Sequence, residues 1–135
     1  MFNIFLIAIG GALGSVTRYL AIEFFTKNFM KNFSANFPSN FPWPVFFVNI
    51  IGSMLAGILY YFMIRYFDSF DVRIKNLVMI GFLGGFTTFS TFSLDFFRLF
   101  TAGQIGLALT YTIASVTISI TALFFGFYLT KLILS

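Results

Sequence analysis

A chain of 135 residues with 59% hydrophobic and 9% charged side chains has a mean hydropathy of +0.97, which is too apolar for a soluble domain of this size. The absence of Cys and His excludes disulfides, thiolate or imidazole metal sites and His-based acid–base catalysis. The net charge is +4, but the basic residues stand singly between apolar runs, which is typical of membrane-topology signals. The composition predicts a protein of the lipid bilayer with no nucleic-acid partner.

Four apolar segments are long enough to cross a bilayer, which takes ~20 helical residues. We expect spans at about residues 2–25, 45–64, 76–94 and 102–130, within a single integral membrane domain that covers residues 1–135. The first run has no basic residues before it and no small-residue cleavage site after it, which indicates a retained span and not a signal peptide. The sequence therefore predicts an all-α, multi-pass membrane protein.

The first span combines a glycine pair with a late cation. Gly10 and Gly14 are four residues apart, a spacing that lets another helix approach the backbone closely. Arg18 follows in the last third of the span. Two interpretations of its guanidinium stay open, because it could extend to the membrane interface or raise the anion concentration in a vestibule.

The connector at residues 26–44 repeats Asn-Phe at a period of four, starting at positions 28, 32, 36 and 40. As far as Phe37, this period would place the rings on one stripe of a helix that lies in the membrane interface. Pro38, Pro42 and Pro44 end any such helix. A simple bias toward Phe and Asn explains the repeat equally well, so the role of the connector stays open.

The second span contains a single amide, Asn49. Alone, such a side chain most often makes an interhelical hydrogen bond, and it gains a functional meaning only if it faces a path shared with other polar groups. The same span offers a small-residue face for helix packing, made of Gly52, Ser53, Ala56 and Gly57.

The stretch at residues 81–93, inside the third span, opens with three glycines and then repeats Thr-Phe-Ser twice. A broken or hydroxyl-rich backbone is tolerated in lipid only where protein or a water-filled path covers it. We expect the chain to bend from Gly84 to Thr87, where freed carbonyls could hold a cation. The helix should resume at Phe89, which places the rings of Phe89 and Phe92 on one side.

The fourth span carries a polar stripe. Tyr111, Ser115 and Ser119 are spaced at i, i+4 and i+8, so they share one face of a helix. Their hydroxyls could bond to their own helix or could line a path, and the stripe alone does not decide between the two.

Acidic residues are few and lie near the predicted membrane edges, at Glu23, Asp68, Asp71 and Asp95. The chain shows no nucleophile with an evident base and no ionisable group deep in a span, which argues against an enzyme and against a proton-coupled transporter. The polar groups within the spans are hydroxyls and one amide, and Phe rings have electropositive edges. Such neutral donors can replace the hydration shell of an anion, so the residues indicate an ion path.

The two sides of the membrane carry equal numbers of basic residues in this topology. The positive-inside rule then has no bias to act on, so insertion in both orientations and an antiparallel dimer become possible. The first side carries Arg65, Arg73, Lys75 and Lys131, and the second carries Arg18, Lys27, Lys31 and Arg98.

Together these motifs resemble the Fluc/CrcB family of small fluoride channels. The specific match is Gly84-Gly85-Phe86-Thr87-Thr88-Phe89-Ser90-Thr91-Phe92-Ser93 in the third span. Weaker matches are Gly10-Gly11-x-x-Gly14 with Arg18, Val48-Asn49 with Gly52, and the stripe of Tyr111, Ser115 and Ser119. The resemblance covers all four spans and departs from the family only in the longer, more aromatic connector.

The resemblance implies a subunit of four transmembrane helices with a break in the third, assembled as an antiparallel, dual-topology homodimer with two pores that both subunits line. It implies that Asn49 donates to fluoride, and that Phe89 and Phe92 turn their ring edges to the anion. Arg18 resembles the family's vestibule arginine. The remaining fluoride-pore residues would be Thr88, Ser90, Thr91, Tyr111, Ser115 and Ser119. A structural sodium ion at the dimer centre would be held by the backbone carbonyls of Gly84 and Thr87 from both subunits.

The leading hypothesis is a fluoride-selective channel in the cell inner membrane that exports fluoride passively and so lowers its toxicity. One alternative is a small dual-topology multidrug exporter, which would need a membrane-embedded carboxylate, and Glu23 is poorly placed for that task. The other alternative is a structural membrane subunit whose hydroxyls only pack helices. In none of the three is the chain an enzyme.

Overall fold

The computed structural model describes residues 1–29, 38–66 and 72–134, and within these ranges the regular structure is helical with no strand. The first helix, α1 (Phe2–Phe24), continues into the π-helical turn η1 (Phe25–Phe29). Helix α3 (Trp43–Tyr66) follows the connector, and α7 (Ile105–Leu134) ends the chain. The segment between them consists of α4 (Val72–Ile74), the π-helix η2 (Lys75–Leu83), α5 (Gly84–Phe86) and α6 (Phe89–Thr101).

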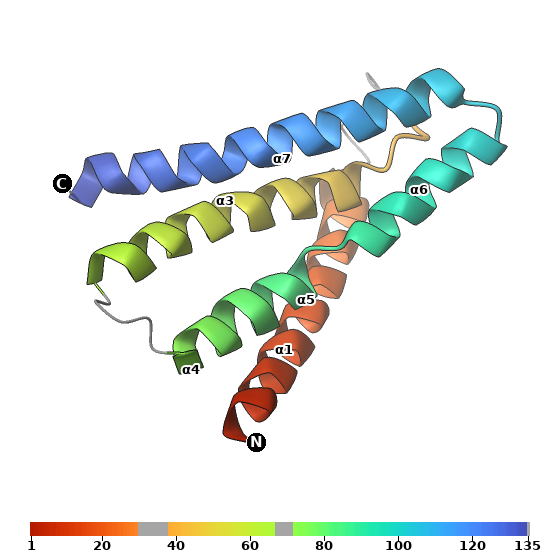
Figure 1. Cartoon of the computed structure of the whole chain (residues 1–135). Helices are drawn as coiled ribbons and strands as arrows, with labels where there is room; N and C mark the ends of the chain where they lie inside the picture. Colours follow the sequence, from red (N-terminus) through yellow and green to blue (C-terminus); the bar gives the residue numbers. More distant parts are fainter. Residues whose placement is uncertain (30–37, 67–71, 135) are drawn as a thin grey trace.

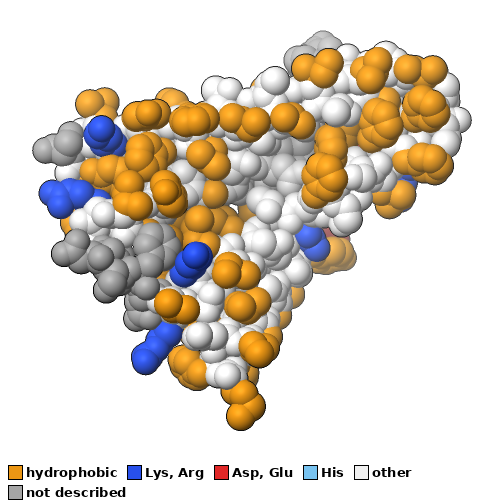
Figure 2. Space-filling model, in the orientation of Figure 1, with side chains coloured by type: hydrophobic (Ala, Val, Ile, Leu, Met, Phe, Trp, Pro, Cys, Tyr) orange, Lys and Arg blue, Asp and Glu red, His pale blue; other side chains and the backbone are white. Residues whose placement is uncertain are grey.

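The prediction of four membrane-spanning helices is confirmed. The helical segments that are long and apolar enough to cross a membrane are Phe2–Asn28, Trp43–Tyr66, Val72–Thr101 and Ile105–Leu134. Their outer surfaces are apolar, because large hydrophobic side chains are exposed along all four, and Figure 2 shows how these side chains cover the visible face. The interfacial helix expected as far as Phe37 lies mostly outside the described residues.

Glycines bring the helices together in two pairs. A Cβ at Gly10 or Gly14 of α1 would collide with the backbone of Leu77 or Phe82, so the close approach predicted for this glycine pair is confirmed. In the second pair, the backbone of α7 fills the space beside Gly57 of α3. Backbone contact of this kind is the usual way in which helices associate in lipid. The acyl chains are as apolar as the helix surfaces, so helices associate through close packing and not through the hydrophobic effect.

In this arrangement α6, which ends the third span, packs against α7, which forms the fourth span. Figure 1 shows α3 and α7 side by side, α1 beside the segment from α4 to α5, and α6 extending along α7. A buried aromatic and aliphatic cluster joins the start of α3 to α6 and α7, and it consists of Phe41, Phe46, Phe92, Leu99, Ala108 and Tyr111.

The third span changes its backbone conformation at two threonines. Helix α5 ends at Phe86, Thr87 (φ −83°, ψ 153°) and Thr88 (φ −146°, ψ 116°) are extended, and α6 begins at the next residue. The expectation that the bend starts at Gly84 is wrong, because Gly84 and Gly85 are helical. The space beside Gly85 is used for packing against the α1 backbone, whereas Thr side chains can bond to nearby backbone groups and so stabilise an extended conformation.

We expect Gly14→Ala to lower the thermal-unfolding midpoint of the detergent-solubilised protein, because the added methyl group meets the carbonyl of Phe82 and forces the two helices apart. Overpacking of this kind costs about 1–3 kcal/mol. The matched control is Gly106→Ala, where no atom lies within 4 Å of the new Cβ, and its midpoint should stay unchanged or rise. Equal midpoints for both variants would contradict the packing role of Gly14.

Candidate functional site

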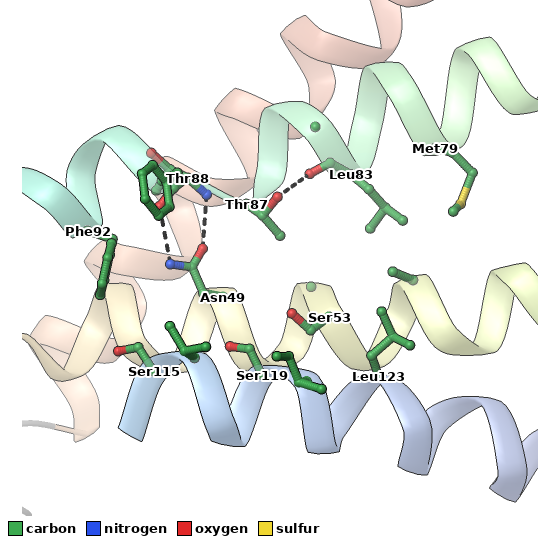
Figure 3. A pocket seen from close by; sticks show the side chains of 16 residues that line it. Asn49, Ser53, Met79, Leu83, Thr87, Thr88, Phe92, Ser115, Ser119 and Leu123 are labelled. Carbon is green, nitrogen blue, oxygen red and sulfur yellow. Dashed lines mark hydrogen bonds between the residues drawn. The ribbon is translucent and has the colours of Figure 1, made fainter. Parts of the chain in front are cut away.

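A cavity of about 470 Å³ lies between α3, α7 and the third span, around the two extended threonines. Figure 3 shows its lining, in which none of the described residues has a charged side chain. Helix α3 contributes Asn49, Gly52, Ser53 and Ala56; the third span contributes Met79, Leu83, Gly84, Thr87, Thr88, Phe89 and Phe92; and α7 contributes Ser115, Val116, Ser119, Ile120 and Leu123. The lining is therefore apolar with a few neutral polar groups.

Asn49 pairs with both backbone groups of Thr88 (Figure 3). Its Nδ2 donates to the Thr88 carbonyl at 3.2 Å, and its Oδ1 accepts from the Thr88 N–H at 2.9 Å. A primary amide has two N–H donors, so one donor of Asn49 stays available to a ligand in the cavity. The interhelical hydrogen bond that Asn49 alone would suggest is thus present, and the side chain also faces the polar residues of the other two spans.

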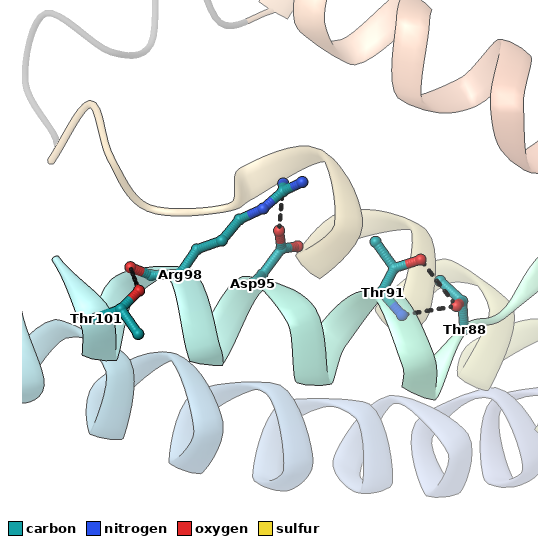
Figure 4. Close-up of polar contacts among 5 residues, drawn as sticks. All are labelled: Thr88, Thr91, Asp95, Arg98 and Thr101. Atoms are coloured by element: carbon teal, nitrogen blue, oxygen red, sulfur yellow. Dashed lines mark hydrogen bonds and ion pairs between the residues drawn. The ribbon is translucent and has the colours of Figure 1, made fainter.

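The hydroxyl of Thr88 caps the N-terminus of α6. It accepts from the backbone N–H of Thr91 at 3.2 Å and donates to the Thr91 Oγ1 at 3.1 Å (Figure 4). It also lies 3.2 Å from the hydroxyl of Ser90. Thr87 is attached to the preceding turn, because both its N–H and its hydroxyl donate to the Leu83 carbonyl at 2.9 Å. The two threonines therefore join the helices on either side of the extended segment.

Two backbone carbonyls at this point lose their helical donors to side chains. In an uninterrupted α-helix the N–H of residue i+4 donates to the carbonyl of residue i. The Thr88 N–H goes to Asn49 and leaves Gly84 without a donor, and the Thr91 N–H goes to the Thr88 hydroxyl and leaves Thr87 without one. No hydrogen bond among the described residues ends on either carbonyl.

These orphan carbonyls suit a hard monovalent cation. Both belong to residues that line the cavity, and carbonyl oxygens are the ligands that such cations accept. The described residues contain no group of His, Cys, Asp and Glu side chains that could hold a metal ion in another way. The residues at Gly84 and Thr87 therefore fit the backbone sodium site that the family resemblance implies.

The rings of the third span form a series that continues into the buried cluster. Phe89 is 78% exposed and its ring centroid lies 5.4 Å from that of Phe92, which is only 9% exposed. The Phe92 ring lies 5.2 Å from Tyr111, and the edge of Phe41 meets Tyr111 at 5.3 Å in a T-shaped contact. The inner ring of the pair is thus held by packing, and the outer ring stands free on the open side of the cavity.

Several predicted pore residues meet in this cavity and others stay outside its lining. Ser115 is buried, and its hydroxyl and the Tyr111 hydroxyl lie close enough to interact with each other. Neither hydroxyl makes a hydrogen bond of normal geometry to any of the described residues. Arg18 is partly buried on α1, away from the lining. The cavity brings together Asn49, Thr88, Phe89, Phe92, Ser115 and Ser119, whereas Ser90, Thr91, Tyr111 and Arg18 do not line it.

Asp95, which the sequence placed near a membrane edge without a role, is buried in the structure. This carboxylate is 8% exposed, its Oδ1 lies 3.5 Å from Nη1 of Arg98, and its Oδ2 has no partner among the described residues (Figure 4). It borders a second cavity of about 450 Å³ near the end of α6. The sequence contained a signal for this burial, because Asp95 follows Phe92 by three residues and so lies on a neighbouring part of the helix surface.

Comparison with known proteins agrees with the resemblance. The family model of CrcB-like protein, Camphor Resistance (CrcB), matches residues 5–127. Three similar proteins, each called "Fluoride-specific ion channel FluC", come from Agrobacterium fabrum (42% identical over 130 residues, covering 93% of this chain and 94% of the relative), Bacteroides fragilis strain ATCC 25285 (42% over 129 residues, 96% of each) and Hahella chejuensis (36% over 128 residues, 95% and 94%). The chain therefore belongs to the CrcB family of membrane proteins.

Proposed function

We propose that this protein is a fluoride-selective channel that lets fluoride leave the cytoplasm passively across the inner membrane. The supporting observation is a cavity whose described lining residues are all uncharged and which contains the buried Ser115 hydroxyl, in a chain whose relatives at 36% to 42% identity are called fluoride-specific channels. Four apolar helices and a family of ion channels also favour a transport protein over an enzyme.

Fluoride is small and strongly hydrated, so a path for it must supply donors that replace water. The cavity offers the Ser115 hydroxyl, the second N–H of Asn49 and the edges of the Phe89 and Phe92 rings. It offers no cationic anchor, which would attract every anion, chloride included. Neutral donors of this kind bind an ion well enough to admit it and weakly enough to release it.

We propose further that two copies assemble as an antiparallel, dual-topology homodimer, with each pore lined by both. Phe89 is exposed on the open side of the cavity and Gly84 beside it is exposed as well, so a second copy could close that side. The balance of basic residues between the two sides of the membrane agrees with insertion in both orientations. In this assembly Arg18 would serve as the vestibule cation that concentrates anions at a pore entrance.

The interruption at Thr87 and Thr88 serves, in this proposal, as the functional break of the third span. The carbonyls of Gly84 and Thr87 from both subunits would hold a structural sodium ion at the dimer centre. Such an ion supplies the positive charge that two pairs of unpaired carbonyls require. The protein's own contribution is to keep those carbonyls free of donors and to hold the two threonines extended.

The biological role follows from acid–base chemistry. In an acidic medium fluoride becomes HF, which crosses membranes and releases fluoride inside a less acidic cell. The trapped ion then needs a charged-ion path outward, and a passive channel provides one without an energy source.

Purified protein in liposomes should release trapped fluoride rapidly and chloride far more slowly, as an ion-selective electrode would record. Selectivity is expected because the path consists of small neutral donors without a cationic anchor. Equal fluxes of both ions, or none of either, would contradict the channel. A multidrug exporter would instead move organic cations and no fluoride, and a structural subunit would move nothing.

Phe89→Ile should reduce the fluoride flux roughly tenfold or more, the effect of about 1.4 kcal/mol on a barrier, because it removes an exposed ring edge from the path. Since Phe89 is 78% exposed, the change should leave folding intact, and Phe92→Ile should have a similar effect on flux. The control is Phe97→Ile on the same helix, where a 59% exposed ring lies outside the cavity. Unchanged flux in the Phe89 variant would make its ring a packing residue.

Ser115→Ala should separate function from stability. The hydroxyl is buried without a hydrogen bond of normal geometry to any of the described residues, so its removal should leave the unfolding midpoint unchanged or higher, while fluoride flux falls. Thr117→Ala provides the comparison, because that hydroxyl donates to the Ile113 carbonyl of its own helix at 2.7 Å and lies outside the cavity. A lower midpoint with normal flux would show that Ser115 only packs helices.

A further inference from the structure

We infer that the side chains of Asn49 and Thr88 are positioning residues for the cation site: each takes up one backbone N–H and so frees the carbonyl that the N–H would otherwise occupy. Asn49 frees Gly84, and Thr88 frees Thr87. The inference rests on the proposed sodium site and extends it, because backbone ligands alone do not explain why this stretch of backbone stays open.

The first step is an exchange of acceptors. In a continuous helix the Thr88 N–H would donate to Gly84, and the Thr91 N–H to Thr87. Here the Thr88 N–H finds the Oδ1 of Asn49 at 2.9 Å, and the Thr91 N–H finds the Thr88 hydroxyl at 3.2 Å. These two donors are satisfied by side chains, and the carbonyls of Gly84 and Thr87 are left as acceptors, the kind of ligand that a cation requires.

The second step is that the contact which holds Thr88 extended comes from another helix. Asn49 belongs to α3, a different span, and Gly52 follows it by three residues on the same side of that helix. A Cβ at Gly52 would collide with the Cγ2 of Thr87, so α3 faces both extended threonines at close range. The extended conformation of Thr87 and Thr88 is thus stabilised by a different helix. Without that contact, we expect the two residues to become helical.

The third step is that different atoms of the Asn49 amide have different roles. The Oδ1 of Asn49 and one of its N–H groups bind the Thr88 backbone, and the second N–H is left for the cavity. Asn49 would therefore serve the cation through the backbone and the anion directly. The two roles are separable, since a carboxylate keeps the acceptor for the Thr88 N–H and loses both donors.

The test detects sodium binding through the thermal stability of the protein, and fluoride flux is measured separately. The thermal-unfolding midpoint of the purified, detergent-solubilised protein is followed as sodium replaces N-methylglucamine at constant ionic strength, with potassium as a comparison. Unmodified protein should gain stability with sodium, because a ligand of the folded state alone stabilises it by mass action. Asn49→Ala should need roughly tenfold more sodium for the same gain, whereas Asn49→Asp should respond as the unmodified protein does and yet lose fluoride flux in liposomes.

A second pair of variants keeps the inference testable if the Asn49 variants fail to fold. Thr88→Val removes the oxygen that accepts the Thr91 N–H and should weaken the sodium response, whereas Thr88→Ser retains that oxygen and should not. Ser115→Ala is the control for the anion path, since it should lower flux and leave the sodium response unchanged.

Three results would overturn the inference. If the unfolding midpoint of the unmodified protein did not depend on sodium, the proposed sodium site would be wrong. Fluoride flux in the same preparation would then show that the channel function is nevertheless correct. A normal sodium response in Asn49→Ala with reduced flux would make Asn49 an anion donor only. A normal response in Thr88→Val would remove the Thr88 hydroxyl from the mechanism.

Discussion

The bidentate pairing of Asn49 with the Thr88 backbone is the contact on which the rest of the site depends. Extended residues inside an apolar span expose peptide groups that lipid cannot satisfy. One side chain from α3 satisfies both groups of Thr88, and the Thr88 hydroxyl satisfies the first turn of α6. These contacts let two extended residues stand inside a membrane-spanning segment with the N–H groups of Thr88 and Thr91 paired, and they leave the carbonyls of Gly84 and Thr87 open.

That pairing is possible only because the helices approach closely. Gly52 gives room to Thr87, and the glycines of α1 let the third span lie against the α1 backbone. Gly57 and Gly126 do the same for α3 and α7. Small residues thus set the distances between the spans, and the hydrogen bonds of the break follow from those distances. A larger side chain at Gly52 would push α3 away from Thr87 and would also enter the cavity that Gly52 lines.

The site separates two kinds of ion with neutral groups. The carbonyl oxygens of Gly84 and Thr87 suit a cation, while the hydroxyl, amide N–H and ring edges of the same cavity suit an anion. No charged side chain enters the cavity, so each preference comes from the direction of local dipoles. Among the described residues, Asp95 is a buried ionisable side chain, but it pairs with Arg98 and borders a different cavity.

Composition and spacing alone determined the membrane class, the four spans and the stretch that holds the site. Long apolar segments indicate spanning helices, and a run of hydroxyl residues within such a segment indicates a site that protein or water covers. Composition and spacing also grouped Ser115 with Ser119, since helical period is a local property. They misplaced the bend, because a glycine in sequence does not reveal whether its space serves a turn or a packed neighbour, and at Gly85 the α1 backbone takes that space. Only the tertiary structure decided that Asn49 reaches across to Thr88, because that hydrogen bond joins residues 39 positions apart and depends on how two helices pack.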